Sequence, residues 1–314
     1  MTFKPQVIPT AMRTMAPNNT TEKLADLVCG DLAYGLATRA LNGWRPFFLA
    51  GRRSAIGAGL ECHMWRGPTD LVPYVAASGN ITIVSSSAQD AYGAFTGVGG
   101  VLVEYIDASG YLRVGVATMA GTTPVSVYKA QLNDDGTVSA LAGFPVATGL
   151  RVLRAYATLL GTSAPATWYA GNIGNIDIKI GASVVCRIGL DPEAVAGMEG
   201  DGTSYGSLFT VPRGFYALLL GLGISCDAAT NVRASISVKK LAIPRQRLVQ
   251  LPIDRSVVSV SLGSPLRISP RYDVDLSMLR VGGGFAGGCN LHFALVPDPA
   301  DPDPTPQYQP PSLG

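Results

Sequence analysis

Short strand-like segments separated by turn residues recur along most of this chain, and they constrain its fold more than any other feature. From Leu71 onward, apolar and β-branched runs return roughly every 8 to 12 residues, with Gly, Pro, Asn, Asp or Ser between them. The run from Ile176 to Ile180 alternates Ile with Asp and Lys, as in a strand with one buried face. Helical periodicity after residue 70 is confined to Pro192–Met198. The pattern predicts an all-β protein built from one or two antiparallel, jelly-roll-like β-sandwiches.

Several turns can be placed from residue chemistry. Asp107–Gly110 separates two apolar runs and predicts a hairpin, because Asp, Ser and Gly favour tight turns. Asn133–Gly136 has the same character. Val211–Phe215 contains Pro-Arg-Gly and predicts a third hairpin, in which the flanking strands pair with each other.

The composition suggests four segments. Residues 1–67 are expected to form an N-terminal arm, with a short helix over about Thr20–Ala40 that begins at a capping box. Residues 68–165 and 170–297 are expected to form two sandwiches, divided where small and polar residues cluster. Residues 298–314 are rich in proline and are expected to form a flexible tail.

The low charge content predicts extensive burial against other chains. Only 15% of residues are charged, although 47% are hydrophobic, whereas a typical soluble domain has about 25% charged residues. The net charge of +2 does not favour nucleic acid as a partner. The longest near-apolar run, Phe215–Ile224, is far shorter than the roughly 20 residues that a membrane-spanning helix needs. No secretory signal peptide is visible, so we expect no membrane association and no export by that route.

The N-terminal segment combines basic and aromatic residues. Up to Arg66 it contains eight Lys or Arg and four acidic residues, a local net charge of +4. Aromatic and arginine side chains dominate many protein interfaces. The candidate interface residues are therefore Trp44, Phe47, Phe48, Arg52, Arg53 and Trp65. The alternative is a small helical subdomain with a solvated face.

Catalytic, cofactor and metal motifs were not found in the sequence. His63 and His292 are expected to be structural, and the five cysteines are expected to be isolated buried thiols rather than a disulfide framework. Two other functions stay open. Trp168 and Tyr169 could form a stacking platform in a host-recognition module that binds surface glycan, and Asp191 with Asp201 could serve a glycan hydrolase or esterase.

A series of short motifs carries a family resemblance. In chain order they are Met64-Trp65-Arg66-Gly67, the serine-terminated strand Ile81–Ser87, the hairpin Val103–Gly110, Gly121-Thr122-Thr123-Pro124-Val125, Ala170-Gly171-Asn172-Ile173 and Phe209–Gly214. Together they resemble a family of virion structural proteins from tailed phages that is common among marine phages. The chain departs from the family pattern at Arg213 and Phe215.

The resemblance implies a non-enzymatic component of a bacteriophage particle, with no catalytic residues to carry over. We expect a capsid decoration, vertex or appendage-base subunit that acts through subunit contacts. Its expected partners are further copies of itself and other virion proteins such as the major capsid protein. The oligomer expected is a trimer. Its expected location is the virion, assembled in the host cytoplasm.

Overall fold

The computed structural model describes residues 44–93, 97–132, 138–160, 171–190, 202–227, 232–240, 245–253, 257–280 and 283–303. Within these ranges the chain has no helix, and every strand pairing is antiparallel, which confirms the predicted all-β fold. No helix that could cross a membrane occurs in them either. The jelly-roll-like strand order stays a prediction. Residues 1–43, including the predicted helix, lie outside the described residues.

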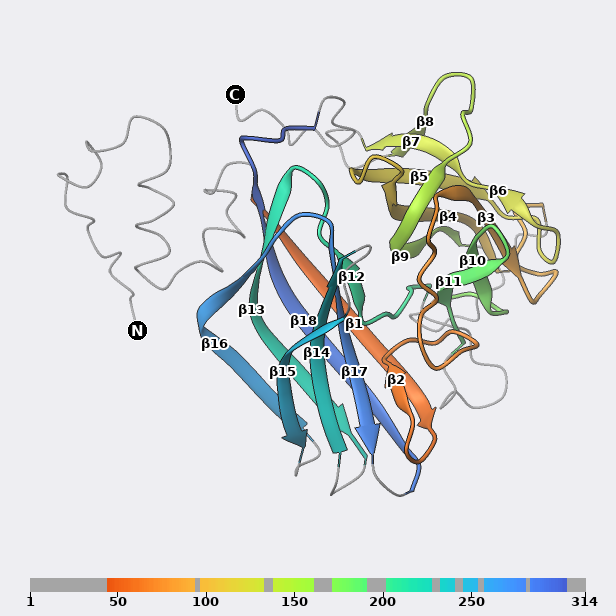
Figure 1. Ribbon diagram of the computed structural model, residues 1–314. Coiled ribbons are helices and arrows are strands. Elements are labelled where there is room, and N and C mark those ends of the chain that lie inside the picture. The colour runs from red at the N-terminus through yellow and green to blue at the C-terminus, as the bar shows by residue number, and fades with distance from the viewer. Residues whose placement is uncertain are drawn as a thin grey trace, which may run out of the picture.

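The strands form three sheets (Figure 1). The four-stranded sheet has the order β1 (Arg45–Ile56), β18 (Phe285–Pro297), β13 (Phe215–Cys226) and β16 (Val257–Ile268). The five-stranded sheet has the order β12 (Leu208–Thr210), β17 (Tyr272–Arg280), β14 (Val232–Lys240) and β15 (Gln246–Ile253), with β2 (Glu61–His63) paired to β17. The nine-stranded sheet has the order β11 (Ser183–Ile188), β10 (Ile176–Ile180), β3 (Gly79–Ser85), β9 (Thr148–Leu160), β4 (Val98–Asp107), β5 (Leu112–Thr118), β7 (Tyr128–Leu132) and β8 (Val138–Ala140), with β6 (Val125–Ser126) paired to β3.

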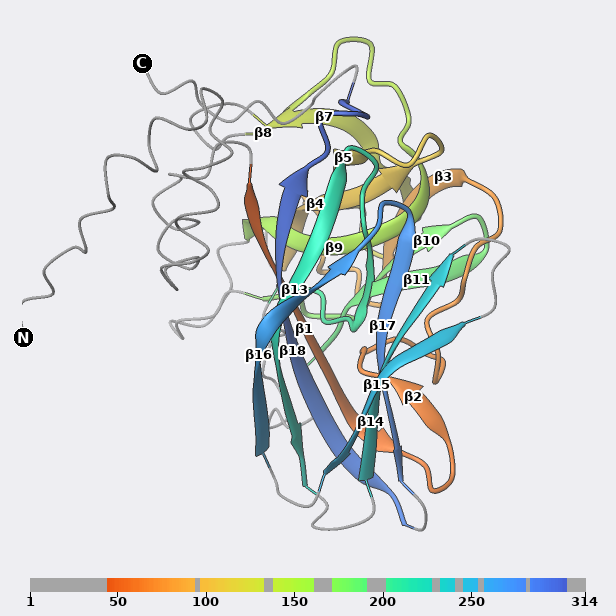
Figure 2. The ribbon, with the colours of Figure 1, turned by 60° about the vertical axis from the view of Figure 1, so that its left-hand side comes forward.

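The four-stranded and five-stranded sheets form a β-sandwich around one apolar core (Figure 2). Alternate residues of each strand point inward, as the two-residue period of a strand requires. Phe47 of β1, Phe209 of β12 and Phe293 of β18 meet in this core, with ring centroids 4.5 and 4.8 Å apart. Burying large side chains of this kind contributes roughly 2 kcal/mol each.

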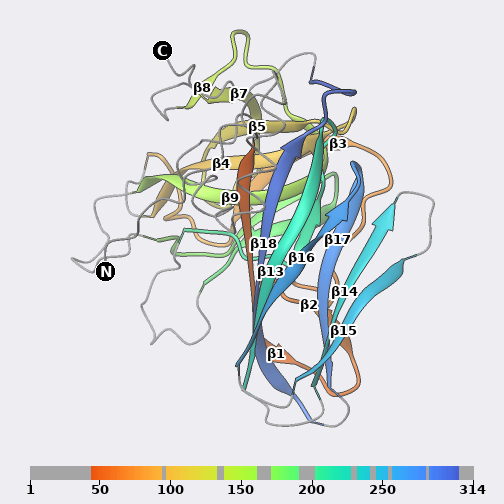
Figure 3. The same cartoon turned by 90° about the vertical axis from the view of Figure 1, so that its left-hand side faces the viewer.

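The nine-stranded sheet encloses a second core beside one end of the sandwich (Figure 3). Its alternation is clearest in β10, where Ile176, Ile178 and Ile180 are buried and the residues between them are half-buried. Ile106 and Leu153 of this sheet belong to the sandwich core, so apolar contacts join the two bodies.

The strands of each sheet come from segments that the sequence analysis had assigned to different domains. The segment 45–63, expected in the arm, supplies β1 and β2 of the sandwich. The segment 176–188, expected in the second sandwich, pairs with β3 in the nine-stranded sheet. Strand pairing over long sequence separations is set by the packing of faces, which a boundary drawn from local composition does not capture.

The predicted hairpin at Val211–Phe215 is a corner between two sheets. The turn itself is present, with Gly214 at a φ of 82°. Its flanking strands do not pair with each other, because β12 pairs with β17 and β13 pairs with β16 and β18. Pro-Arg-Gly therefore carries the chain across the sandwich, which is a common way to build a corner between packed sheets. The hairpin predicted at Asp107–Gly110 is confirmed between β4 and β5. The turn at 133–136 lies outside the described residues, although β7 and β8 pair on either side of it.

The start of the expected flexible tail is docked on the chain's own surface. Asp303 forms two hydrogen bonds with Arg113 of β5, at 2.5 and 3.0 Å, and Asp301 pairs with Arg213 of the corner at 2.6 Å. The Asp298 amide donates to the Gly214 carbonyl at 2.8 Å. The segment 298–303 thus connects the end of the sandwich to the nine-stranded sheet through its aspartates. The prediction of a flexible tail was based on the many prolines and did not take these acidic side chains into account.

We predict that Asp303→Ala will release this segment locally. The Arg113 side chain is only 8% exposed, so losing its two-pronged partner should weaken docking by about 1 to 2 kcal/mol, or about tenfold. Hydrogen exchange should become correspondingly faster in 298–303. Asp177→Ala, which removes the partner of Arg187 on β10 and β11, should leave that exchange unchanged. Equal protection of the segment in both variants would contradict the prediction.

Candidate interaction surface

The four-stranded sheet has an unusual outer face. Its strands contain no Asp or Glu, and β13 and β18 contain no Lys or Arg either. The solvent-facing side of an antiparallel sheet normally carries polar and charged residues. Here many outward positions hold small or uncharged residues, namely Ala50, Gly223, Ser225, Ala286, Gly288, Asn290 and His292. The charged side chains of this face are basic, Arg52 of β1 and Arg267 of β16.

Phe48 stands out on this face. It is 56% exposed, while its neighbours Phe47 and Leu49 point into the sandwich core. Its ring lies edge-on to His292 of β18, with centroids 5.0 Å apart, so the exposed phenyl group is held in place by the adjacent strand. An exposed aromatic side chain on a sheet face whose strands contain no carboxylates is the kind of residue that anchors a protein interface.

An open groove of about 460 Å³ lies next to Phe48. Residues 50–53, 205, 225–227 and 286–290 line it. Asp227 at its end receives a 2.7 Å hydrogen bond from the Ala286 amide, and this fixes the connection between β13 and β18. Much of the lining is backbone and small side chains, and the half-buried Arg52, Arg53 and Tyr205 supply its larger side chains.

The structure separates the candidate interface residues into groups. Phe48 and Arg52 lie on the outer face, and Trp44 is partly buried against Leu218, Leu220 and Ala294 on the same face. Arg53 is committed to an ion pair with Asp70 at 2.6 Å. Phe47 and Trp65 are 3% and 1% exposed and serve the chain's own cores, which corrects their assignment as contact residues. The sequence gives no sign of this difference, because aromatic residues occur on both faces of β1.

Other candidate residues cannot be placed on any surface. Trp168, Tyr169, Asp191 and Asp201 lie outside the described residues. Four of the five cysteines are described, and Cys62, Cys186, Cys226 and Cys289 are buried thiols that form no disulfide, as predicted. Burial raises the pKa of Cys186 to about 11 and that of Cys289 to about 12.

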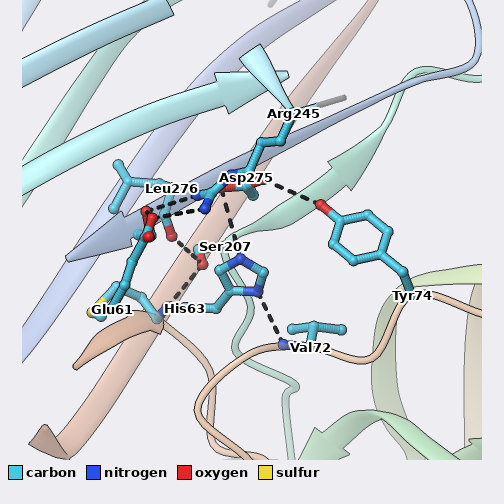
Figure 4. Close-up of polar contacts among 10 residues, drawn as sticks. Glu61, His63, Val72, Tyr74, Ser207, Arg245, Asp275 and Leu276 are labelled. Atoms are coloured by element: carbon cyan, nitrogen blue, oxygen red, sulfur yellow. Dashed lines mark hydrogen bonds and ion pairs between the residues drawn. The ribbon is translucent and has the colours of Figure 1, made fainter. Parts of the chain in front are cut away.

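A second cluster, missed by the sequence analysis, lies on the outer side of the five-stranded sheet (Figure 4). Asp275 of β17 is fully buried, and Arg245 donates to it at 2.5 Å. The Tyr74 hydroxyl donates to the other carboxylate oxygen at 3.1 Å. Arg245 also pairs with Glu61 of β2 at 2.8 Å, and Glu61 accepts a hydrogen bond from Ser277.

His63 belongs to the same cluster, and both of its ring nitrogens lie close to polar partners within the chain. Its Nδ1 accepts the Val72 amide at 3.0 Å, and its Nε2 lies 3.7 Å from Asp275. Burial and, to a smaller extent, the nearby Arg245 lower the pKa of His63 to about 4. The neutral ring therefore serves as an acceptor that fixes the 64–75 loop, in agreement with its expected structural role.

The cluster is not arranged as a nucleophile with its base. Ser207 donates to the Leu276 carbonyl at 2.7 Å and accepts the Met64 amide at 2.8 Å, so its hydroxyl is used by the backbone. Burial raises the pKa of Asp275, although Arg245 and Tyr74 act in the opposite direction. For Glu61, burial favours a higher pKa, but Ser277 and Arg245 outweigh it and the pKa is lowered. These contacts join β2, β17 and the 64–75 loop.

Comparisons with known proteins place few limits on function. No protein-family model and no curated protein matches the chain. The crystal structure of the infectious bursal disease virus VP2 subviral particle matches over 81% of this chain and 72% of that chain, with 10% sequence identity and a TM-score of 0.19. The structure of infectious bursal disease virus Gx strain matches over 82% and 72%, with 10% identity and a TM-score of 0.17. Similarity at these TM-scores is weak, and it carries no argument about this chain's function.

Proposed function

We propose that this chain is a structural subunit of a bacteriophage particle, as a capsid decoration, vertex or appendage-base protein. The observation that carries the proposal is the outer face of the four-stranded sheet, which lacks carboxylates and presents Phe48 beside an open groove. Such a face is well suited to burial against another protein. The motif order that resembles tailed-phage virion proteins supports the same role.

The mechanism we propose is assembly through this face. A contact there requires little desolvation of charge, because β13 and β18 contain no charged residues. Phe48 would supply the apolar anchor and Arg52 a polar contact at the rim. We propose further copies of this chain, together with other virion proteins, as the partners.

The virion role is tested directly in purified particles. Quantitative mass spectrometry of virus particles from the chain's own source should find it at a fixed ratio to the major capsid protein. That ratio should persist through density-gradient purification. Absence of the chain from intact particles would refute the proposed role.

The interface is tested by Phe48→Asp. Placing a carboxylate at the centre of a buried contact should weaken self-association at least tenfold, which corresponds to about 1.4 kcal/mol or more. Sedimentation velocity over a concentration series measures this change. Phe144→Asp is a matched control, because Phe144 is 64% exposed and lies on the nine-stranded body. Equal effects of the two substitutions, or a wild-type chain that stays monomeric at every soluble concentration, would contradict assembly through this face.

A further inference from the structure

The first half of β16, residues 257–262, is a stretch of sheet edge without the usual protection. β16 lies at the end of the four-stranded sheet, and among the described residues it pairs only with β13. An unpaired edge presents a row of backbone donors and acceptors that can pair with another strand. Proteins normally protect such edges with charged residues, proline or bulges.

Two other edge strands of the sandwich, β15 and β1, have that protection. β15, at the edge of the five-stranded sheet, contains Arg247 and Pro252. β1, at the opposite edge of the four-stranded sheet, contains Pro46 and three arginines. The second half of β16 likewise contains Pro265 and Arg267, but its first half reads Val-Val-Ser-Val-Ser-Leu and contains neither charge nor proline. Uncharged segments of high β-propensity are the ones most prone to strand addition.

The exposure of β16 fits an edge that is incompletely covered. Val257 is 66% exposed, the largest value among the exposed large hydrophobic residues of the described chain. Val258 and Val260 point inward and are only partly buried against the sandwich core. The register with β13 is regular from Val257 to Ser261 and then breaks, so the flat part of the edge is this short segment.

We propose that this segment pairs antiparallel with the same segment of a second copy, about a two-fold axis at Ser259. The sequence is self-complementary in that register, since Val258 of one copy falls opposite Val260 of the other. The inward valines would then extend the apolar layer of the sandwich across the junction. A two-fold pairing of identical strands is closed and leaves no free edge at the contact.

This pairing rests on the proposed role in assembly but uses a different surface. The outer face with Phe48 and the β16 edge would supply two separate contacts, and a shell or lattice needs more than one. A pairwise edge contact also differs from the trimer expected from the sequence. The two contacts can be separated by variants that affect only one of them.

The first test is Ser259→Lys on the full chain. Two lysines facing each other across the axis should weaken the edge-paired dimer at least tenfold in sedimentation velocity. Gln250→Lys, at an exposed position on β15, is the matched control and should be neutral. Thermal unfolding of both variants checks that the fold is retained. Unchanged association of a folded Ser259→Lys variant overturns the proposal, and loss of association in Phe48→Asp alone would leave the outer face as the assembly contact.

The second test examines the register of the proposed pairing between the two β16 strands. Residues opposite each other in an antiparallel pair have Cα atoms about 4.5 to 5.5 Å apart, within the range that a disulfide spans. Ser259→Cys should therefore form a covalent dimer under mild oxidation, whereas Gln250→Cys and the wild-type chain should not. The β16 amides that do not bond to β13 should exchange rapidly in a monomer. If these edge amides are already protected in the monomer, another segment of the same chain occupies the edge, and the proposal is overturned.

Discussion

Replacing Asp90 by Ala should destabilise the chain by about 4 kcal/mol, one of the largest effects we expect from a single substitution. Asp90 is fully buried, and its carboxylate accepts four hydrogen bonds. The donors are the Ser85 hydroxyl at 2.6 Å and the amides of Val98, Ile173 and Gly174 at 2.8 to 3.0 Å. Alanine would leave these buried donors without an acceptor, and each unsatisfied group costs about 1 to 3 kcal/mol before relaxation.

The position of Asp90 explains why the loss should affect the whole nine-stranded sheet. Its partners come from the end of β3, the start of β4 and the 172–174 loop before β10, so one side chain holds three segments together. Chemical denaturation followed by circular dichroism measures the free energy of unfolding. Asp70→Ala is the control, because Asp70 is 45% exposed and its ion pair with Arg53 should contribute less than about 1 kcal/mol. Similar losses in the two variants would refute this account of Asp90.

The example of Asp90 shows what sequence patterns can and cannot predict here. The strand at Ile176–Ile180 and the hairpin at Asp107–Gly110 were predicted because both signals are local. The Ala170–Ile173 motif entered only as part of a resemblance, whereas the structure shows Ile173 and Gly174 as donors to a carboxylate more than 80 residues away. A contact over that separation has no local periodicity or spacing that would reveal it.

The interaction surface was predictable only in part. Phe48 and Arg52 were selected because aromatic and arginine side chains are common at protein interfaces. The same argument also selected Phe47 and Trp65, which are buried in the chain's own cores. The absence of charge in Phe215–Cys226 and Phe285–Pro297 was visible in the sequence. Its meaning required knowing that these two segments are neighbours in one sheet and that one face of that sheet is exposed. The adjacent β16 edge required the strand order as well.

The polar cluster on the outer side of the five-stranded sheet leads to the second large prediction. Replacing Arg245 by Met should destabilise the chain by about 3 to 5 kcal/mol at pH 7, because Asp275 would remain buried without its cation. Arg187→Met is the matched control. Its ion pair with Asp177 is about one-fifth exposed on each side and should contribute about 1 kcal/mol or less. A double variant, Arg245→Met with Asp275→Asn, removes the uncompensated charge and should recover most of the loss.

The pH dependence distinguishes a charge effect from a packing effect. In the wild-type chain the pKa of Asp275 is already raised by burial above its ordinary value of 3.8, and removing Arg245 raises it further. The pKa of Glu61 should also rise, because it loses a cation that lowers it. A carboxyl with a raised pKa binds its proton more tightly in the folded state, so stability falls as the pH rises through the folded-state pKa. Loss of Arg245 also lets His63 accept a proton more readily beside Asp275, which acts in the same direction. The deficit of Arg245→Met should therefore be largest at neutral pH and shrink towards pH values near the ordinary carboxyl pKa. Denaturant titrations of variant and wild type across this range measure it, and a deficit that does not change with pH would show that Arg245 stabilises the chain by packing alone.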